Sequence, residues 1–287
     1  MSGKPTVDVS VIVPNYNNGR YLTAFVNSVL SSTVEPRQLI IVDDGSTDNS
    51  GKVLDSFSML DFLQVIRFEK NLGLTAALNA ALDVSFGKYV MRADPDDLLL
   101  PERIRLQFEF MEANPGVDVL GCNVVYFNSE TGRDINISNF ALKSSLIQKA
   151  YKKGEHGIQH PTAFVKGEVY RSYRYQKIFP GEDYEIFSRM VKDSRSFANL
   201  PQILYRMRVH AGSSTSNLKI DFIRNTFMFR DRIFGTKTPE NRIHGYYLHI
   251  LYYRKFQNAD NPVLKYFFLM ISAALYPRKL LKRIFNF

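Results

Sequence analysis

A short acidic motif, Asp94-Pro95-Asp96-Asp97, follows the apolar run Lys88–Ala93. In an extended chain, residues two apart project to the same face, and a proline favours extension of the residue before it. We therefore expect Asp94 and Asp96 to point together into a ligand crevice and Asp97 to point away from it. Paired carboxylates suit Mg²⁺ or Mn²⁺, which complete their coordination with substrate phosphates and water. A solvated acidic turn is the alternative, and the motif alone leaves both open.

A second acidic pair, Asp43 and Asp44, follows the apolar run Leu39–Val42. Two adjacent carboxylates at a strand end repel each other, so they are costly without partners. The neighbouring Gly45 and Asp48 have an ordinary explanation, because glycine permits a turn and aspartate caps helices. That explanation does not extend to the acidic pair, which indicates a binding role for it.

A third acidic pair, Glu182 and Asp183, follows Pro180-Gly181, where a helix is expected to begin. The helix dipole favours ionised carboxylates at that end, and a positioned carboxylate can take a proton from a hydroxyl group. Acids are also common in the first turn of helices without any catalytic role. His210 is similarly open, because a lone histidine after a strand is either a metal ligand or a structural residue.

The elements that must position these residues alternate between strands and helices. Apolar runs predict strands at Val7–Val13, Leu39–Val42, Phe62–Phe68 and Lys88–Ala93. Helical spacing follows each of them, so we expect βαβ units around a mostly parallel sheet. In open α/β sheets, ligands bind at the carboxyl ends of the strands, which is where the first two acidic groups lie. After about residue 121 the alternation becomes irregular.

The excess positive charge lies in the last quarter of the chain. Residues 216–287 contain 13 Lys and Arg against 4 Asp and Glu, and this excess of nine equals the net charge of +9 of the whole chain. In Pro277–Phe287, basic and apolar residues alternate in pairs and would fall on opposite faces of a helix. Such a helix suits an anionic membrane surface, although a terminal helix packed on the domain is possible. This uneven distribution is not that of a nucleic-acid-binding protein, so nucleic acid is not an expected partner.

The single cysteine, Cys122, excludes an intrachain disulfide and suggests a reducing compartment. The longest apolar stretch, Tyr266–Tyr276, is shorter than the ~18–20 residues that span a bilayer. Residues Met1–Asp8 do not resemble a secretory signal. We therefore expect a cytoplasmic protein, peripheral at the inner face of the cell membrane.

Six motifs occur in order at ordinary spacing: Val9–Asn17, Val42–Asp48, Asn71–Gly73, Asp94–Asp97, Gly181–Tyr184 and Tyr205–His210. Together they resemble the family 2 glycosyltransferases, which are inverting enzymes of the GT-A fold. The resemblance covers roughly Val7 to Ser216. It implies an α/β fold of GT-A type, with a mostly parallel central sheet flanked by helices and a C-terminal helical tail. The implied domains are a nucleotide-sugar-binding and catalytic domain over 1–215 and a basic, aromatic-rich helical region over 216–287.

The resemblance also implies roles for single positions on the donor side. Pro14 and Tyr16 would line the nucleobase pocket, with Asp43 and Asp44 near the base and the ribose. These four residues, together with Asp94, would bind the nucleotide sugar.

Further implied roles concern the metal and the chemistry. Asp94 would face the ribose or the metal, and Asp96 would bind the Mn²⁺ or Mg²⁺ that bridges the diphosphate. Asp183 would be the general base. His210 would lie near the metal or the pyrophosphate, in a flexible closing segment. The stretch Tyr173–Lys177 replaces the Gly-Gly turn that many members have, and we expect it to shape the acceptor side.

The implied activity is inverting transfer of a hexosyl group from a nucleoside-diphosphate sugar to a hydroxyl of a saccharide or lipid-linked saccharide. Among the possible donors, we expect a UDP-sugar first. This would serve cell-surface polysaccharide or glycolipid synthesis. A metal-dependent nucleotidyltransferase is a second possibility, but the loop Pro14–Arg20 is a poor match to the Gly-rich triphosphate loop of such enzymes. A catalytically inactive membrane-surface scaffold is a third, and the presence of every expected carboxylate argues against it.

Overall fold

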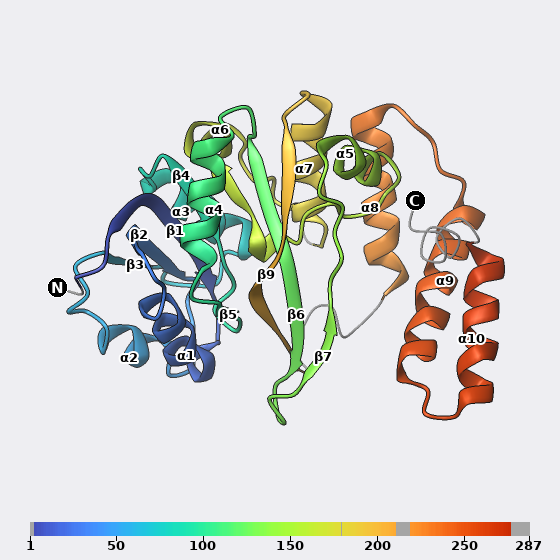
Figure 1. Ribbon diagram of the computed structural model, residues 1–287, viewed down its shortest axis with the longest axis horizontal. Coiled ribbons are helices and arrows are strands. Elements are labelled where there is room, and N and C mark those ends of the chain that lie inside the picture. The colour runs from blue at the N-terminus through green and yellow to red at the C-terminus, as the bar shows by residue number, and fades with distance from the viewer. Residues whose placement is uncertain (1–2, 179, 211–218, 277–287) are drawn as a thin grey trace. The chain divides into compact units, whose positions relative to one another are not determined.

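The computed structural model describes residues 3–178, 180–210 and 219–276. The chain forms two compact units, Met1–Ser216 and Asn217–Phe287 (Figure 1). The first unit contains the sheet, and the described part of the second is formed by helices. The stretch Pro277–Phe287, in which we predicted a basic amphipathic helix, lies outside the described residues.

The first half of the sheet is parallel and is built from βαβ units. Its strands run in the order β3-β2-β1-β4, and every neighbouring pair among them is parallel. These strands are β1 (Thr6–Asn15), β2 (Glu35–Asp43), β3 (Leu63–Arg67) and β4 (Tyr89–Arg92). The helices that connect them are α1 (Gly19–Leu30), α2 (Ser50–Asp55) and α3 (Leu74–Val84). The predicted α/β fold is confirmed, and each of the four predicted strands overlaps an observed one.

Beyond β4 the nine-stranded sheet is mixed and continues in the order β8-β6-β9-β5, with β7 beside β6. These strands are β5 (Leu98–Leu99), β6 (Val119–Asn128), β7 (Asp134–Ile137), β8 (Phe164–Lys166) and β9 (Phe197–Val209). The parallel pair β6–β9 joins segments far apart in the sequence, while β4–β8, β8–β6 and β9–β5 are antiparallel. Long-range pairing explains why the alternation of the sequence becomes irregular after residue 121.

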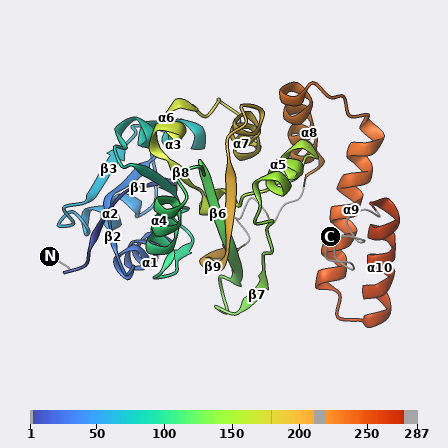
Figure 2. The ribbon, with the colours of Figure 1, turned by 45° about the horizontal axis from the view of Figure 1, so that its top comes forward.

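Helices cover both faces of this sheet (Figure 2). On one face, alternate residues of β1 such as Val11 pack with Phe25 of α1 and with Ile104 of α4 (Arg103–Ala113) in one apolar core. Helix α3 covers the opposite face of β1 and β2. The remaining helices of the unit are α5 (Ser144–Lys152), η1 (His160–Thr162), α6 (Gly167–Ser172) and α7 (Glu182–Lys192). Fully burying one large apolar side chain stabilises the fold by about 1.5–3 kcal/mol.

The second unit contains α8 (Ile220–Phe234), α9 (Glu240–Asn258) and α10 (Pro262–Leu275). Asn261 caps α10, because its Oδ1 accepts hydrogen bonds from the backbone N–H groups of Val263 and Leu264 at 2.9 and 3.3 Å. Pro262 occupies the first helical position, as the pair Asn261-Pro262 predicts. Among the described residues, no helix combines the length and the apolar character needed to cross a membrane.

Candidate active site

A cavity of about 630 Å³ lies where the parallel strands end. It is bounded by the segments that follow β1, β2, β3 and β4, which is the edge of the sheet where the sequence predicts ligand binding. Of the predicted site residues, the structure brings the following together in its wall: Pro14, Tyr16, Asp44, Asp94 and Asp96. The wall also contains Lys177, the last residue of the stretch Tyr173–Lys177 that we expect to shape the acceptor side, and Ile178, which was not predicted.

Asp44 lies in the cavity wall and is fixed by backbone donors from the loop after β3. Its Oδ1 accepts a hydrogen bond of 2.6 Å from the N–H of Leu72, and its Oδ2 accepts one of 2.9 Å from the N–H of Gly73. The turn at Gly45, with φ of 68°, brings these loops together. A Cβ atom at Gly45 would lie 2.5 Å from the carbonyl carbon of Lys70, so only glycine fits there.

Asp43 is buried and is absent from the residues that line the cavity. Its Oδ1 accepts a hydrogen bond of 3.0 Å from Nδ2 of Asn15 and another from the hydroxyl of Ser46. The two adjacent carboxylates therefore have separate partners, which offsets their mutual repulsion. Asp43 thus contacts Asn15, which lines the cavity, without lining the cavity itself.

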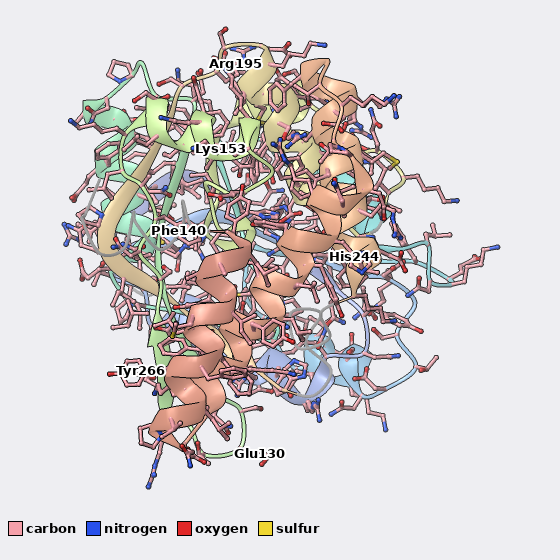
Figure 3. The ribbon with its side chains drawn as sticks, turned by 90° about the vertical axis from the view of Figure 1, so that its right-hand side faces the viewer. Glu130, Phe140, Lys153, Arg195, His244 and Tyr266 are labelled. Atoms are coloured by element: carbon pink, nitrogen blue, oxygen red, sulfur yellow. The ribbon has the colours of Figure 1, made fainter. Side chains whose placement is uncertain are left out.

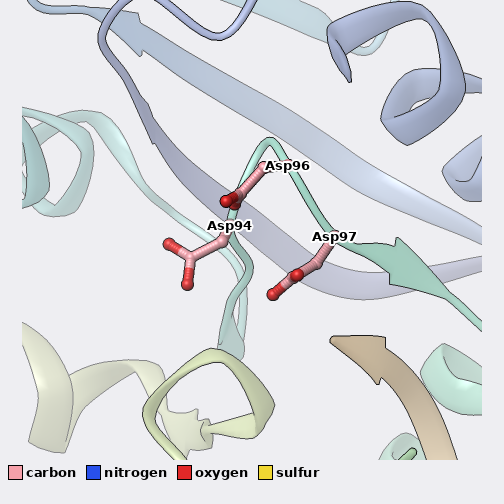
Figure 4. A group of neighbouring side chains, drawn as sticks. All are labelled: Asp94, Asp96 and Asp97. Atoms are coloured by element: carbon pink, nitrogen blue, oxygen red, sulfur yellow. The ribbon is translucent and has the colours of Figure 1, made fainter. Parts of the chain in front are cut away.

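Three carboxylates gather in the loop between β4 and β5 (Figure 4). Oxygen atoms of Asp94, Asp96 and Asp97 all lie within 4.8 Å of one another. Our expectation of an extended segment was wrong, because the chain turns here and the N–H of Asp97 donates to the carbonyl of Asp94 at 3.3 Å. The turn brings Asp97 to the other two carboxylates, where extension would have pointed it away. Asp97 is buried and does not line the cavity.

The electrostatics of this cluster suit a divalent cation. Burial raises the pKa of Asp94, although the buried guanidinium of Arg92, 2.5 Å away, acts against that rise. Burial, followed by the charges of Asp96 and Asp94, raises the pKa of Asp97 well above its usual value. The three carboxylates lie close together, and the donor atoms that they offer are all hard oxygens. This donor set fits Mg²⁺ or Mn²⁺.

Strand β9 holds the acidic loop in place. The hydroxyl of Tyr205 accepts a hydrogen bond of 2.9 Å from the N–H of Asp94. The N–H of Arg208 donates to Oδ1 of Asp97 at 2.6 Å, and its Nε donates to the carbonyl of Asp96 at 2.6 Å. These supporting roles were not predicted. The signal in the sequence was the motif Tyr205–His210, which contains both Tyr205 and Arg208.

His210 lies at the edge of the acidic cluster, just past the end of β9. Its Nε2 lies 3.0 Å from Oδ2 of Asp96, and its ring packs on Tyr21 with centroids 5.4 Å apart. The structure therefore places this predicted residue beside the cluster. The residues that follow it, 211–218, lie outside the described part of the chain.

Asp183 lies in the first turn of α7, which follows Gly181 in a left-handed conformation with φ of 110°. Its Oδ2 lies 3.2 Å from Nε2 of His156. Burial opposes ionisation, but His156 and then His160 outweigh it and hold the pKa of Asp183 below its usual value. The charge of Asp183 in turn raises the pKa of Asp94, so the two carboxylates lie within electrostatic reach of each other. His156 had no signal in the sequence, because it is a lone histidine in a loop.

The stretch Tyr173–Lys177 is fastened to α3. The N–H of Tyr175 donates to Oδ1 of Asn79 at 2.9 Å, and Nδ2 of Asn79 donates back to the carbonyl of Tyr175 at 2.9 Å. Arg174 forms an ion pair with Asp83 of the same helix. This attachment places Lys177 in the cavity wall. The acceptor-side role of the stretch stays a prediction.

Comparison with known proteins gives relatives for most of the chain. Amylovoran biosynthesis glycosyltransferase AmsE of Erwinia amylovora is 32% identical over 212 residues, which cover 72% of this chain and 78% of that protein. The UDP-Gal:alpha-D-GlcNAc-diphosphoundecaprenol beta-1,3-galactosyltransferase of Escherichia coli is 30% identical over 190 residues, which cover 66% of this chain and 68% of that protein.

Solved structures share the fold at lower identity. S. aureus TarS 1-349 in complex with UDP-GlcNAc superposes with a TM-score of 0.63 at 20% identity, covering 94% of this chain and 72% of that one. Mannosyltransferase PcManGT from Pyrobaculum calidifontis, in complex with GDP-Man and Mn²⁺, superposes with a TM-score of 0.55 at 17% identity. The match covers 95% of this chain and 70% of that one. Residues 10–174, more than half of the chain, match the profile of Glycosyl transferase family 2. The chain belongs to glycosyl transferase family 2, and it is a glycosyltransferase with the GT-A fold.

Proposed function

We propose that this enzyme transfers a hexosyl group, with inversion, from a UDP-sugar to a hydroxyl of a saccharide or a lipid-linked saccharide. The observation that carries this proposal is the cavity at the carboxyl edge of the sheet, with Asp94 and Asp96 of the acidic cluster in its wall. The relatives add support for cell-surface polysaccharide or glycolipid synthesis. One is named for amylovoran biosynthesis, and another for transfer from UDP-Gal to a diphosphoundecaprenol-linked sugar.

The donor lies in the cavity in this proposal. Pro14 and Tyr16 contact the base, and the ring of Tyr16 is available for stacking because the residue is 45% exposed. Asp44 accepts from the ribose hydroxyls through the lone pairs that its backbone partners leave open. Asp94 and Asp96 hold Mn²⁺ or Mg²⁺. When bound, such an ion stabilises the charge that develops on the leaving diphosphate.

The acceptor is activated by Asp183. Its carboxylate takes the hydroxyl proton as the acceptor oxygen attacks the anomeric carbon and the bond to the diphosphate breaks. The lowered pKa keeps this carboxylate ionised at neutral pH, which is the form that can accept the proton. A single displacement of this kind inverts the anomeric configuration.

A screen of nucleotide sugars tests the proposal. The protein is incubated with UDP-, GDP- and dTDP-hexoses and Mn²⁺ or Mg²⁺, with and without saccharide acceptors. We expect release of UDP and a product anomer, read by NMR, opposite to that of the donor. Retention of configuration would contradict inversion. Release of pyrophosphate from nucleoside triphosphates would instead support a nucleotidyltransferase.

We also propose that the second unit binds an anionic membrane surface. Residues 216–287 contain the whole positive excess of the chain. On α10, exposed side chains three or four positions apart form one apolar face: Val263 at 76%, Tyr266 at 67% and Met270 at 71% exposed. Figure 3 shows Tyr266 projecting outward from this helix. Apolar insertion beside basic residues favours binding at anionic lipid.

A further inference from the structure

Both oxygens of the Asp183 carboxylate have partners in the structure. Oδ1 accepts a hydrogen bond of 2.7 Å from the N–H of Tyr184, and Oδ2 lies 3.2 Å from Nε2 of His156. Each carboxylate oxygen carries two lone pairs, so one on each oxygen remains open. Partners on both oxygens together fix the plane of the carboxylate, and hence the direction of those open lone pairs.

The position of His156 is itself set by α7. Its ring meets the ring of Tyr184 edge-on, with centroids 5.5 Å apart and planes at 70°. Tyr184 is fully buried, and its hydroxyl donates to the backbone carbonyl of Tyr151 in α5. Two consecutive residues of α7 therefore contact His156. Tyr184 packs against its ring, and Asp183 contacts its Nε2 atom.

The second histidine near Asp183 has a different environment. His160 is buried, and its Nε2 lies 2.7 Å from the hydroxyl of Tyr175. Burial, together with the positive charge of Arg92, holds the pKa of His160 well below its usual value. The side chain of His156 is 41% exposed and is the one that contacts Asp183 directly. The two histidines are therefore not equivalent, and only His156 is placed to orient the carboxylate.

We infer that His156 is a positioning residue for the base: its ring fixes the Asp183 carboxylate in the orientation that receives the acceptor proton. This inference rests on the proposed function, in which Asp183 is the base. His156 acts on the acceptor side, so it has no part in binding the nucleotide.

Several titratable groups face Asp183, and the effect of His156 must be separated from theirs. They are His156, His160, Tyr151, Tyr170, Glu182 and Asp94. After burial, His156 has the largest influence on Asp183, and it favours the ionised form. Removal of His156 takes away the influence that favours ionisation, so burial should raise the pKa of Asp183. Because activity needs the ionised base, the decline of kcat toward acidic pH should then begin at a higher pH than in the wild type.

The experiment compares the full-length wild type with His156→Ala, His156→Gln, Asp183→Asn and the double variant His156→Ala/Asp183→Asn. The turnover number kcat is measured from the lowest pH at which each protein stays folded up to pH 9, and the Kd for UDP with Mn²⁺ is titrated. We expect His156→Ala to lower kcat about tenfold or more, a part of the 10²–10⁴-fold contribution of a general base. The Kd should not change, and the decline of kcat toward acidic pH should move to a higher pH. The exposed His244, in the second unit, provides the matched control His244→Ala, which should change nothing.

The glutamine variant and the double variant separate positioning from a structural role. Glutamine can donate an N–H to Asp183 without carrying charge. His156→Gln should therefore have a higher kcat than His156→Ala, but its kcat should still decline toward acidic pH earlier than that of the wild type. If His156 acts through Asp183, His156→Ala should cause no further loss in the Asp183→Asn background. An equal loss in both backgrounds, or a wild-type pH profile in His156→Ala, would overturn this inference but not the assignment of Asp183 as the base. Wild-type turnover in Asp183→Asn would overturn the proposed base and this inference with it.

Discussion

Nε2 of His210 lies 3.0 Å from Oδ2 of Asp96, although 114 residues separate them in the chain. The contact joins the end of β9 to the loop between β4 and β5. It adds to two hydrogen bonds that Arg208 donates to the same loop, one from its backbone N–H and one from its Nε. The acidic cluster is therefore held by the C-terminal end of β9 and by the residue that follows it.

Replacing Asp96 with alanine should abolish transfer and strongly weaken metal-dependent nucleotide binding. The carboxylate is partly exposed in the cavity wall, so its loss removes a ligand atom and leaves the core intact. UDP titration with and without Mn²⁺ measures the binding, and the melting temperature checks the fold. Asp61→Ala is the matched control, because Asp61 is exposed between α2 and β3. Full activity of Asp96→Ala, or of the wild type in EDTA, would contradict the metal assignment.

Replacing Asp183 with asparagine separates chemistry from donor binding. Asparagine keeps the size of the side chain but cannot take the acceptor proton. Turnover should fall by about 10²–10⁴-fold, or roughly 3–5 kcal/mol of barrier, while the Kd for UDP with Mn²⁺ changes little. Asp96→Ala should differ by losing nucleotide binding as well. Near wild-type turnover would remove Asp183 from the mechanism.

Glu182 should make the protein less stable as the pH rises. Burial, and then the charge of Asp183, raises the pKa of Glu182 to about 7, from an ordinary value of 4.5. Between these values the unfolded chain releases a proton that the folded protein retains, so the free energy of unfolding falls with pH. Glu182→Gln removes this effect and should stabilise the protein at pH 8 by up to about 3 kcal/mol, with a much smaller gain at pH 5.

Urea unfolding of the wild type and Glu182→Gln at pH 5 and pH 8 measures this difference. Glu168→Gln is the control, because Glu168 is exposed on α6 and its replacement should be neutral at both pH values. A gain for Glu182→Gln that is the same at pH 5 and pH 8 would show that titration is not its cause.

Removing Pro277–Phe287 should reduce binding to anionic vesicles without eliminating transfer to a soluble acceptor. The segment contains four basic residues: Arg278, Lys279, Lys282 and Arg283. Each basic residue near an anionic surface contributes about 1 kcal/mol at low salt. Co-sedimentation with phosphatidylserine vesicles measures the loss, and phosphatidylcholine vesicles serve as the reference. Equal co-sedimentation of the truncated and full-length proteins would contradict the role of this segment.

The first half of the sheet could be predicted because its information is local. The run Val7–Val13 is apolar throughout and ends at a proline, and the helical spacing after it leaves little choice of structure. Carboxyl ends of neighbouring parallel strands meet at one edge, so Asp44 and Asp94 could be placed in one site before their contacts were known.

The remainder of the site depends on contacts that no local pattern contains. The position of His156 is decided by Tyr184, and that of Lys177 by the attachment of Tyr175 to α3. The turn in the segment Asp94–Asp97 was missed for a different reason. Pro95 restricts the residue before it but does not prevent a turn through Asp96, and the hydrogen bonds from β9 stabilise that turn.

Strand β9 is the last strand of the first unit in the described chain, and it has a consequence for protein engineering. A chimera that exchanges the C-terminal unit should be joined after Ser216, because the graft then retains Tyr205, Arg208 and His210 beside the acidic loop. A junction placed before Tyr205 would bring foreign side chains to the acidic loop. The residues that support the acidic loop therefore limit where such a junction can be placed, and that limit lies close to the end of the first unit.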